Sequence, residues 1–211
     1  HRGAAALGRP GIRHGFFGRA GGAQHGFLLA QRLMIRGENL SGLELGSPHA
    51  EVVVRECLVT LSDGDALRIV GKAGTREQAL SVRILESTLS SRGNGFHLIA
   101  PENGASTPVG ISLQNSILSS PASERSALLT AENWPKSLGS DETSGPLLGV
   151  YWAVKKSTIS GWKSLLKMIP EDTLSTQSPE EWKKLWKQSA TDEEIVAGNW
   201  PSAPDAFSPL Q

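Results

Sequence analysis

Two carboxylates separated by one glycine are the nearest approach in this chain to a hydrolytic site. Asp63 and Asp65 stand in the segment Ser-Asp-Gly-Asp that begins at Ser62. Cleavage of a glycosidic bond uses a pair of carboxylates around the scissile bond, and a calcium-assisted lyase also needs clustered carboxylates. Both side chains could lie on one turn, near Glu86 or His97 of the next repeat. Ser-Asp-Gly-Asp is also a good turn sequence, so a structural role is favoured over a catalytic one.

Arg68 and His97 are candidates for ligand binding. They occupy nearly matching places in two successive repeats, and each alternates with apolar residues such as Leu67 or Phe96. This alternation places both polar side chains on the outer face of one sheet. They would form a shallow binding face there, although a solvated sheet face without a ligand is the favoured interpretation. A lyase would also require a basic residue such as Arg68.

The other residues with suitable chemistry form no site for a metal or a cofactor. His14, His25 and His49 lack the spacing of metal ligands. The glycine-containing run before Lys72 resembles a phosphate-binding loop only superficially. Its spacing is wrong, and Ala73 stands where such a loop has serine or threonine. We therefore expect neither a metal ion nor a cofactor.

A repeated segment identifies the elements that must position these side chains. Residues 51–61 return in altered form as residues 80–89 and again as residues 109–118, which gives two nearly equal steps along the chain. Apolar residues at alternate positions predict strands at about 52–55, 82–85 and 111–114. The side chains expected to face inward are Val52/Val54, Val82/Ile84 and Ile111/Leu113.

The repeat also predicts how the strands assemble. Each unit has a second apolar run, at 66–70, 95–99 and 127–130, and glycine, asparagine, aspartate and serine fill the gaps between runs. A unit of this kind cannot bury its apolar side alone, so successive units must stack. Leucine-rich repeats and helical repeats fit the pattern less well. The sequence therefore predicts an all-β solenoid, a right-handed single-stranded parallel β-helix with a short helical C-terminal extension.

Two neighbouring positions of the repeat predict what its turns contain. Cys57 falls where Ser87 and Ser116 stand, so it is expected to be a small residue packed in a turn rather than a reactive thiol. Glu56 and Glu86 precede the first two of these residues, and an asparagine precedes the third. Neighbouring carboxylates repel each other, so this position is expected to be exposed.

The chain divides into three parts. Residues 1–26 are rich in glycine, alanine, arginine and histidine and are expected to be irregular or disordered. Residues 27–160 should form the rungs of the β-helix, with residues 150–154 as one more rung strand. Residues 161–211 are expected to form a helical and proline-rich extension that caps the solenoid.

Two helices are expected in that extension. Residues 161–169 place Trp162, Leu165, Leu166 and Ile169 on one helical face. The second helix, at 178–188, is marked by a Ser-x-x-Glu capping box that begins at Ser178. The apolar side chains of this second helix, expected to pack near the last rung, are Trp182, Leu185 and Trp186.

Composition excludes some classes of partner. The 211 residues contain 21 Lys plus Arg and 21 Asp plus Glu, so the net charge is zero and nothing favours attraction to nucleic acid or an anionic membrane. The apolar stretches are too short to span a bilayer. A single cysteine excludes an intrachain disulfide bond. We expect no nucleic-acid partner and no membrane span.

The repeated alternation around Val52, Val82 and Ile111 resembles the right-handed β-helix repeat of the pectate-lyase-like superfamily. The C-terminal third resembles the end of such proteins in planctomycete-type bacteria, where a strand leads to a helical Ser-x-x-Glu-Trp segment and an Asp-Pro-Phe-like ending. The matching pieces are 150–161, 178–188 and 204–207, and the resemblance covers roughly residues 27–207. No Asp/Arg/Lys signature of a lyase or hydrolase site can be placed on this chain.

The resemblance implies a polysaccharide or a cell-surface glycan as partner, and a secreted or cell-surface location. The superfamily holds enzymes as well as inert scaffolds, so the fold does not decide the activity. We expect a non-catalytic scaffold or carbohydrate- and surface-interaction module. The alternative is a divergent polysaccharide lyase or glycoside hydrolase. Because the chain starts at His1 rather than methionine, it is expected to be part of a longer protein with an upstream domain.

Overall fold

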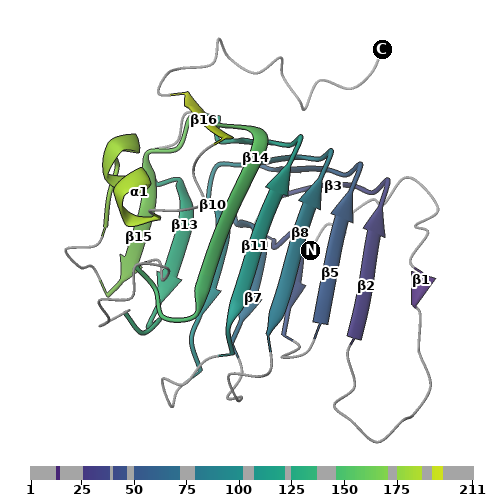
Figure 1. The fold of residues 1–211 in the computed structure, drawn as a ribbon. Coiled ribbons are helices and arrows are strands. Elements are labelled where there is room, and N and C mark those ends of the chain that lie inside the picture. The colour runs from purple at the N-terminus through teal and green to yellow at the C-terminus, as the bar shows by residue number, and fades with distance from the viewer. Residues whose placement is uncertain are drawn as a thin grey trace, which may run out of the picture.

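The computed structural model shows parallel strands that wind around one core in a β-helix-like solenoid (Figure 1). It describes residues 13–14, 26–38, 40–46, 50–71, 79–101, 107–121, 125–136, 146–170, 175–186 and 192–196. The expected disorder of residues 1–26 and the proline-rich end of the C-terminal extension lie almost entirely outside these ranges. Within residues 1–26, the described residues form β1 (Arg13–His14) and the first residue of β2.

Three short strands make each of the first four rungs in the described part of the chain, and two strands make the fifth. The rungs are β2 (Gly26–Gln31), β3 (Met34–Gly37) and β4 (Leu43–Leu45); β5 (Ala50–Arg55), β6 (Leu58–Leu61) and β7 (Asp65–Val70); β8 (Leu80–Leu85), β9 (Thr88–Ser91) and β10 (Asn94–Ile99); β11 (Val109–Gln114), β12 (Ile117–Ser119) and β13 (Ala127–Glu132); β14 (Val150–Ser160) and β15 (Ser164–Ile169).

The strands form two sheets. An 11-stranded sheet runs in the order β1-β2-β5-β8-β11-β14-β12-β9-β6-β3, and it doubles back because the long strand β14 belongs to both of its arms. β16 (Asp192–Val196) also pairs with β14. The second sheet has five strands in the order β15-β13-β10-β7-β4. All described strand pairs between successive rungs are parallel, and of the described strands only β1 pairs antiparallel, with β2.

The predicted inward residues form the core. Val82 lies in register between Val52 and Ile111, and Ile84 lies between Val54 and Leu113. All six predicted core side chains are at most 2 % exposed. The expected strands at 52–55, 82–85 and 111–114 are therefore confirmed, as is the extra rung strand expected at 150–154.

A sharp corner separates the first two strands of each rung. Glu56, Glu86 and Asn115 occupy it with φ of 53°, 50° and 50°. A residue in this left-handed region turns the chain within one position, and a side chain other than that of glycine, asparagine or aspartate rarely adopts it. This turn divides one long run of alternating residues into the first and second strands of a rung, so each of these rungs has three strands rather than two.

Small polar residues on the inner side of this corner connect successive rungs by hydrogen bonds. The backbone N–H of Cys57 donates to Ser87 Oγ at 3.1 Å, and that of Ser87 donates to Ser116 Oγ at 3.2 Å. Ser116 continues the series by donating its N–H to Ser157 Oγ at 3.1 Å. Cys57 is buried and its Sγ donates to the Ala30 carbonyl, and burial raises the pKa of its thiol. The prediction that Cys57 is a packed small residue is confirmed.

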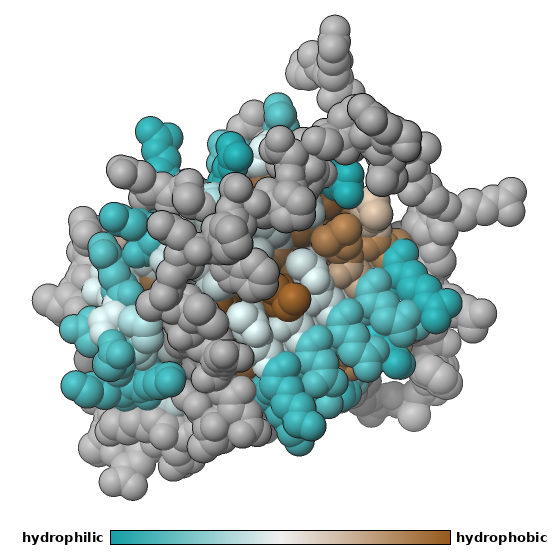
Figure 2. Space-filling view, turned by 90° about the horizontal axis from the view of Figure 1, so that it is seen from above, coloured by the Kyte–Doolittle hydropathy of each residue, from teal (hydrophilic) through white to brown (hydrophobic). Residues whose placement is uncertain are grey.

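Charged side chains line the outside of the corner and appear as a diagonal hydrophilic row in Figure 2. Arg55 Nε lies 3.4 Å from Glu56 Oε1 and 3.3 Å from Glu86 Oε2, and Arg32 Nε lies 2.6 Å from Glu56 Oε2. Arg55 thus separates the two carboxylates that the repeat brings together. Exposure of the corner position is confirmed for Glu86 and Asn115, whereas Glu56 is half-buried beneath the two arginines.

The expected helix at 161–169 is wrong. Residues 164–169 form β15, which extends the five-stranded sheet in register with β13 and places Leu166 beside Leu129. Leu165, Leu166 and Met168 are buried, whereas Lys167 and Ile169 are exposed. Two neighbouring buried residues break the alternation expected of a strand, and a short apolar run of this kind imitates a helical stripe. The solenoid therefore continues past residue 160.

A short helix closes the C-terminal end of the solenoid. Helix α1 (Pro179–Leu185) begins after Ser178, whose Oγ accepts the N–H of Glu181. The Glu181 carboxylate accepts from Thr176 instead of from the Ser178 N–H, so only one half of the expected capping box forms. Trp182 and Trp186 are buried against Trp152 of the last rung. A helix is confirmed at the predicted place, with its apolar side chains packed on the solenoid, but it ends at Leu185, and residues 187–188 of the predicted helix lie outside the described ranges.

The opposite end of the solenoid is more open. β1 lies along part of β2, but within the described ranges no strand pairs with the outer edges of β3 and β4. Of the helices in the part of the chain that the structure describes, none has the length and apolar character needed to cross a bilayer.

Candidate functional site

A network of polar side chains lies on the five-stranded sheet, where β7, β10 and β13 run side by side. We call it the His97 cluster: Asp65, Asn94, His97, Thr130 and Glu132. Parallel pairing with one repeat between strands sets His97 beside Arg68 on one side and beside Thr130 on the other. The expected neighbourhood of Arg68 and His97 on one sheet is therefore confirmed.

His97 stands between two carboxylates. Its Nδ1 lies 2.9 Å from Asp65 Oδ2, and its Nε2 lies 3.1 Å from Glu132 Oε2. A carboxylate accepts hydrogen bonds, so both ring nitrogens donate only when the imidazole carries two protons. The side chains of His97 and Asp65 are each 14 % exposed, which weakens screening by water. The geometry thus favours the charged imidazolium.

A second branch of the network runs through Asn94. Its Nδ2 donates to Asp65 Oδ1 at 2.6 Å, and its Oδ1 accepts from Thr130 Oγ1 at 2.7 Å. Both carboxylate oxygens of Asp65 are therefore engaged, one by Asn94 and one by His97. Thr130 is buried, so this branch anchors the cluster to the strand that follows in the sheet.

The pKa values of the pair move apart. The hydrogen bond to Asp65 raises the pKa of His97 above its usual range, and this outweighs the opposing effect of burial. Burial alone would raise the pKa of Asp65, but hydrogen bonds from His97 and Asn94 outweigh it and hold that pKa below its usual range. The two shifts together widen the pH range in which Asp65 and His97 form an ion pair.

Arg68 extends the polar surface beyond the cluster. Its Nη1 lies 3.5 Å from Glu44 Oε2 on β4, and its side chain is 40 % exposed. Its Nε is buried and has no hydrogen-bond partner among the described residues. Arg68 is thus held only loosely by Glu44 and retains donors that a ligand could engage.

Asp63 does not join this network. It is exposed, and its Oδ1 accepts the N–H of Gly64 at 2.8 Å. Gly64 has φ of 94°, and a Cβ atom there would lie 2.4 Å from the carbonyl oxygen of Leu40. The Ser-Asp-Gly-Asp segment is therefore a tight turn that only glycine fits at its third position. This supports the structural role that the sequence favoured.

The predicted surroundings of the two aspartates are only half right. Asp65 does meet His97 of the next rung, as expected. Glu86 lies at a different place, in the corner between β8 and β9, where it pairs with Arg55. From the sequence, Asp65 is a catalytic candidate, and Arg68 and His97 are binding candidates. In the structure these residues lie together in one site.

Three members of the cluster were missed by the sequence reasoning. Asn94 follows Asp65 by one step of the repeat, so its position could have been read from the spacing. Thr130 follows His97 by a longer step, and Glu132 is two positions further on. The longer connection before β13 hides the correspondence of these two.

The cluster is not arranged to hold a metal ion. No group of three or more histidine, cysteine, aspartate or glutamate side chains in the described ranges could do so. In the His97 cluster both ring nitrogens face carboxylates, so the imidazole has no lone pair directed at a common centre.

We expect the cluster to make stability depend on pH. A raised folded-state pKa means that the contribution of His97 is fully present below 6.5 and is lost as pH rises through the folded value. The contribution of Asp65 is fully present above 3.8 and is lost as pH falls through its lowered value. Thermal melting should therefore show the largest difference between the native chain and His97→Gln between these two values.

Titration of the His97 ring by NMR checks the same prediction directly, and its pKa should exceed 6.5. A ring pKa at or below that value, or a difference in melting temperature that stays constant from acid to alkaline pH, would contradict the ion pair.

In comparisons with known proteins, no protein-family model, curated protein or solved structure matches the chain.

Proposed function

We propose that the chain is a non-catalytic module of a longer protein, and that it binds a polysaccharide or cell-surface glycan through the Arg68–His97 face of the five-stranded sheet. We further propose that the solenoid is a right-handed single-stranded β-helix of the pectate-lyase-like kind, from a planctomycete-type bacterium, and that it acts at the cell surface or outside the cell. The superfamily and the source rest on the sequence repeat and on the form of the C-terminal segment.

The hydrogen bonds that engage both oxygens of the Asp65 carboxylate are the observation that favours binding over cleavage. Both of its oxygens are engaged, and its lowered pKa keeps it ionised. A glycosidase needs one carboxylic acid with a raised pKa to protonate the leaving group, and a second carboxylate across the bond. Asp63 caps its own turn and is exposed, so it does not supply that acid.

The same face has features that suit binding. Arg68 presents a partly exposed guanidinium beside His97, and guanidinium pairs well with the carboxylates of acidic sugars. The strands beneath are held in register by the rungs on both sides, so the backbone positions that carry Arg68 and His97 are fixed. A preorganised surface loses little conformational entropy when a ligand binds.

The open N-terminal edge supports the idea that the module belongs to a longer protein. Within the described residues the outer edges of β3 and β4 lack a strand partner, and exposed edges invite pairing with a further strand. Additional rungs from an upstream part of the same protein would satisfy these edges.

We expect no cleavage of polygalacturonate by the chain, and we expect its migration to be retarded in a gel that contains this polymer. Cleavage is measured from new reducing ends and from the absorbance of unsaturated products. Arg68→Gln should abolish the retardation, because it removes the charge that pairs with uronate carboxylates. Arg36→Gln is the matched control, since Arg36 is exposed on β3, in the other sheet.

Turnover that disappears in Asp63→Asn or Asp65→Asn, with the fold intact, would replace this proposal by the lyase or hydrolase alternative. Retardation that Arg68→Gln leaves unchanged, or that is absent for the native chain, would show that this face is not the binding site for acidic glycans.

A further inference from the structure

The outer face of the arm β2-β5-β8-β11-β14 carries a feature that the His97 cluster does not explain. These five strands lie side by side and face the viewer in Figure 1. Parallel register places one residue from each strand in a row across this face: Phe27, Glu51, Ser81, Gly110 and Tyr151. The row therefore has an aromatic ring at each end.

Both rings are unusually open. Tyr151 is 56 % exposed and Phe27 is 44 % exposed. Neighbouring strands in a sheet lie about 4.8 Å apart, so the four spacings between these residues separate them by about 19 Å. A single exposed apolar side chain is common on protein surfaces, so the surface between the rings decides whether they belong to a binding site.

Close to Tyr151, the surface between the rings carries only small, uncharged residues. Gly110 faces outward, and a Cβ atom built on it would find no heavy atom closer than 4.0 Å, so the space above it is open. Ser81 and Ser112 flank it, and their side chains make no hydrogen bond within the described part of the protein. Ala153 stands beside Ser112 on the last rung.

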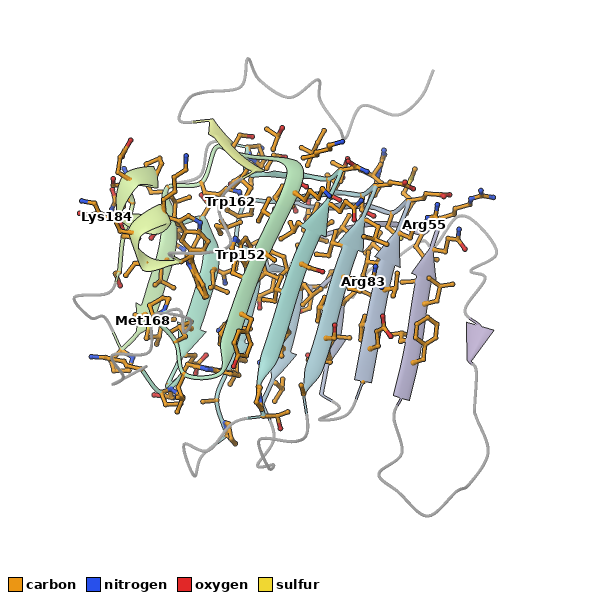
Figure 3. All side chains as sticks on the ribbon, in the orientation of Figure 1. Arg55, Arg83, Trp152, Trp162, Met168 and Lys184 are labelled. Atoms are coloured by element: carbon orange, nitrogen blue, oxygen red, sulfur yellow. The ribbon has the colours of Figure 1, made fainter. Side chains whose placement is uncertain are left out.

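The charged groups on this part of the face neutralise each other. Arg83 Nη1 lies 3.3 Å from Glu51 Oε1, and both side chains are nearly half exposed. Arg83 is labelled on this face in Figure 3. An aromatic platform, free hydroxyls and a neutral Arg–Glu pair suit a ligand that is rich in hydroxyl groups and has no net charge.

We propose that this face binds an extended, uncharged polysaccharide strand that stacks on the Tyr151 ring and crosses the trough at Gly110 and Ser81 toward the Arg83–Glu51 pair. The apolar faces of pyranose rings stack on aromatic rings, and their hydroxyls bond to serine, arginine and carboxylate groups. The rung spacing of about 4.8 Å is comparable with the length of one pyranose unit, so successive sugars meet successive rungs.

Other occupants fit this face less well. A peptide that adds as a strand needs a free sheet edge, but β11 is paired on both sides, with β8 and β14. A nucleic acid needs an excess of positive charge, which the Arg83–Glu51 pair does not provide. A second copy of this chain remains as an outcome that the experiment must distinguish.

This inference rests on the proposed function in one respect, because both treat the chain as a glycan-binding module. It assigns uncharged glycans to the β2-β5-β8-β11-β14 face, whereas the proposed function assigns acidic glycans to the Arg68–His97 face. Binding of cellohexaose and mannohexaose is measured by isothermal titration calorimetry with the full chain. We expect binding of at least one of these probes, weakened about tenfold or more by Tyr151→Ala and by about threefold or less by Tyr151→Phe, which keeps the ring.

Gly110→Val provides a test in which binding and stability move in opposite directions. The open space above Gly110 accommodates the new side chain, and valine suits a strand better than glycine, so the melting temperature should rise by about 1–4 °C. The same side chain fills the trough, so the oligosaccharide should no longer bind. Ile117→Ser, at an exposed apolar residue on β12, is the control and should bind normally.

Three results would overturn the inference. The first is that neither probe binds. The second is that Tyr151→Ala and Gly110→Val bind the oligosaccharides as the native chain does. If Arg68→Gln abolishes binding in that case, the ligand binds at the Arg68–His97 face, and the proposed function stands without this inference. The third is a dimer in size-exclusion chromatography that Tyr151→Ala dissociates, which would make the face an interface between two copies.

Discussion

A chain that carries Ile84→Asp is expected to lose about 4 kcal/mol or more of its free energy of unfolding, and this is enough to unfold many domains of this size. Ile84 is fully buried in the centre of the solenoid, between Val54 and Leu113 of the neighbouring rungs. An aspartate there has no cationic partner and must either stay charged in an apolar core or take up a proton. Circular dichroism with urea denaturation measures the loss, and Val54→Asp should behave in the same way.

The control for this prediction is Gln114→Asp, which places the same residue at an exposed position of the neighbouring strand β11. It allows for the poor fit of aspartate to any strand, and it should cost about 1 kcal/mol or less. Ile84→Val should cost about 0.5–1.5 kcal/mol, since it removes one methylene group from the core. An Ile84→Asp chain that unfolds at the same urea concentration as Gln114→Asp would contradict the stacked core.

The first strand of each rung could be predicted because its signal repeats. Val52 and Val54 alone are a weak indication of a strand, but the same alternation returns twice at nearly equal steps, and this also fixes the register. Stacked parallel strands require similar side chains at equal steps, because each core position contacts its copy in the next rung. The periodicity therefore predicted stacked parallel strands and the residues that form their core.

The middle strand of each rung was harder to separate from the first. Leu89 is the single apolar residue of β9, and one inward apolar residue does not make an alternating pattern. The turn before it depends on Glu86 in the left-handed region, a conformation for which glutamate has no preference. The sequence accordingly predicts at least two strands per repeat, and the structure has three.

The candidate site was predictable where it follows the repeat and unpredictable where the loops differ in length. Asp65 and His97 were both singled out, and the structure joins them. Glu132, the second carboxylate on His97, was missed because the connection before β13 is longer than the connection before β10. The hydrogen bond to Asp65 that raises the pKa of His97 joins two successive rungs, and no single repeat contains it.

The second large effect is expected at the C-terminal end, where aromatic side chains close the core. The Trp152 ring centroid lies 5.3 Å from that of Trp182 and 5.4 Å from that of Phe96, both in edge-to-face geometry. Trp186 lies 6.3 Å from Trp152 on the same side. Helix α1 thus covers the inward-facing residues of the last rung, which no further rung covers among the described residues.

A chain that ends at residue 177 should therefore associate with itself and melt at a lower temperature. It keeps β15, which belongs to the last rung, but it lacks α1 and leaves Trp152 without the two indoles of that helix. It also lacks β16, so the edge of β14 that β16 pairs with loses this partner. Uncovered apolar surface at the end of a parallel solenoid favours stacking of one molecule on another. Light scattering coupled to size-exclusion chromatography measures the association, and binding of an apolar dye measures the exposed surface.

Trp182→Ala tests the same contact without removing any segment. It should cost about 3–5 kcal/mol, because a fully buried indole is replaced by a cavity. Lys183→Ala is the control, since Lys183 lies on the exposed side of α1 and should change stability by about 0.5 kcal/mol or less. A truncated chain that stays monomeric with an unchanged melting temperature, together with a mild Trp182→Ala effect, would show that α1 does not close the core. The remaining role for its two tryptophans would then be to bind a ligand.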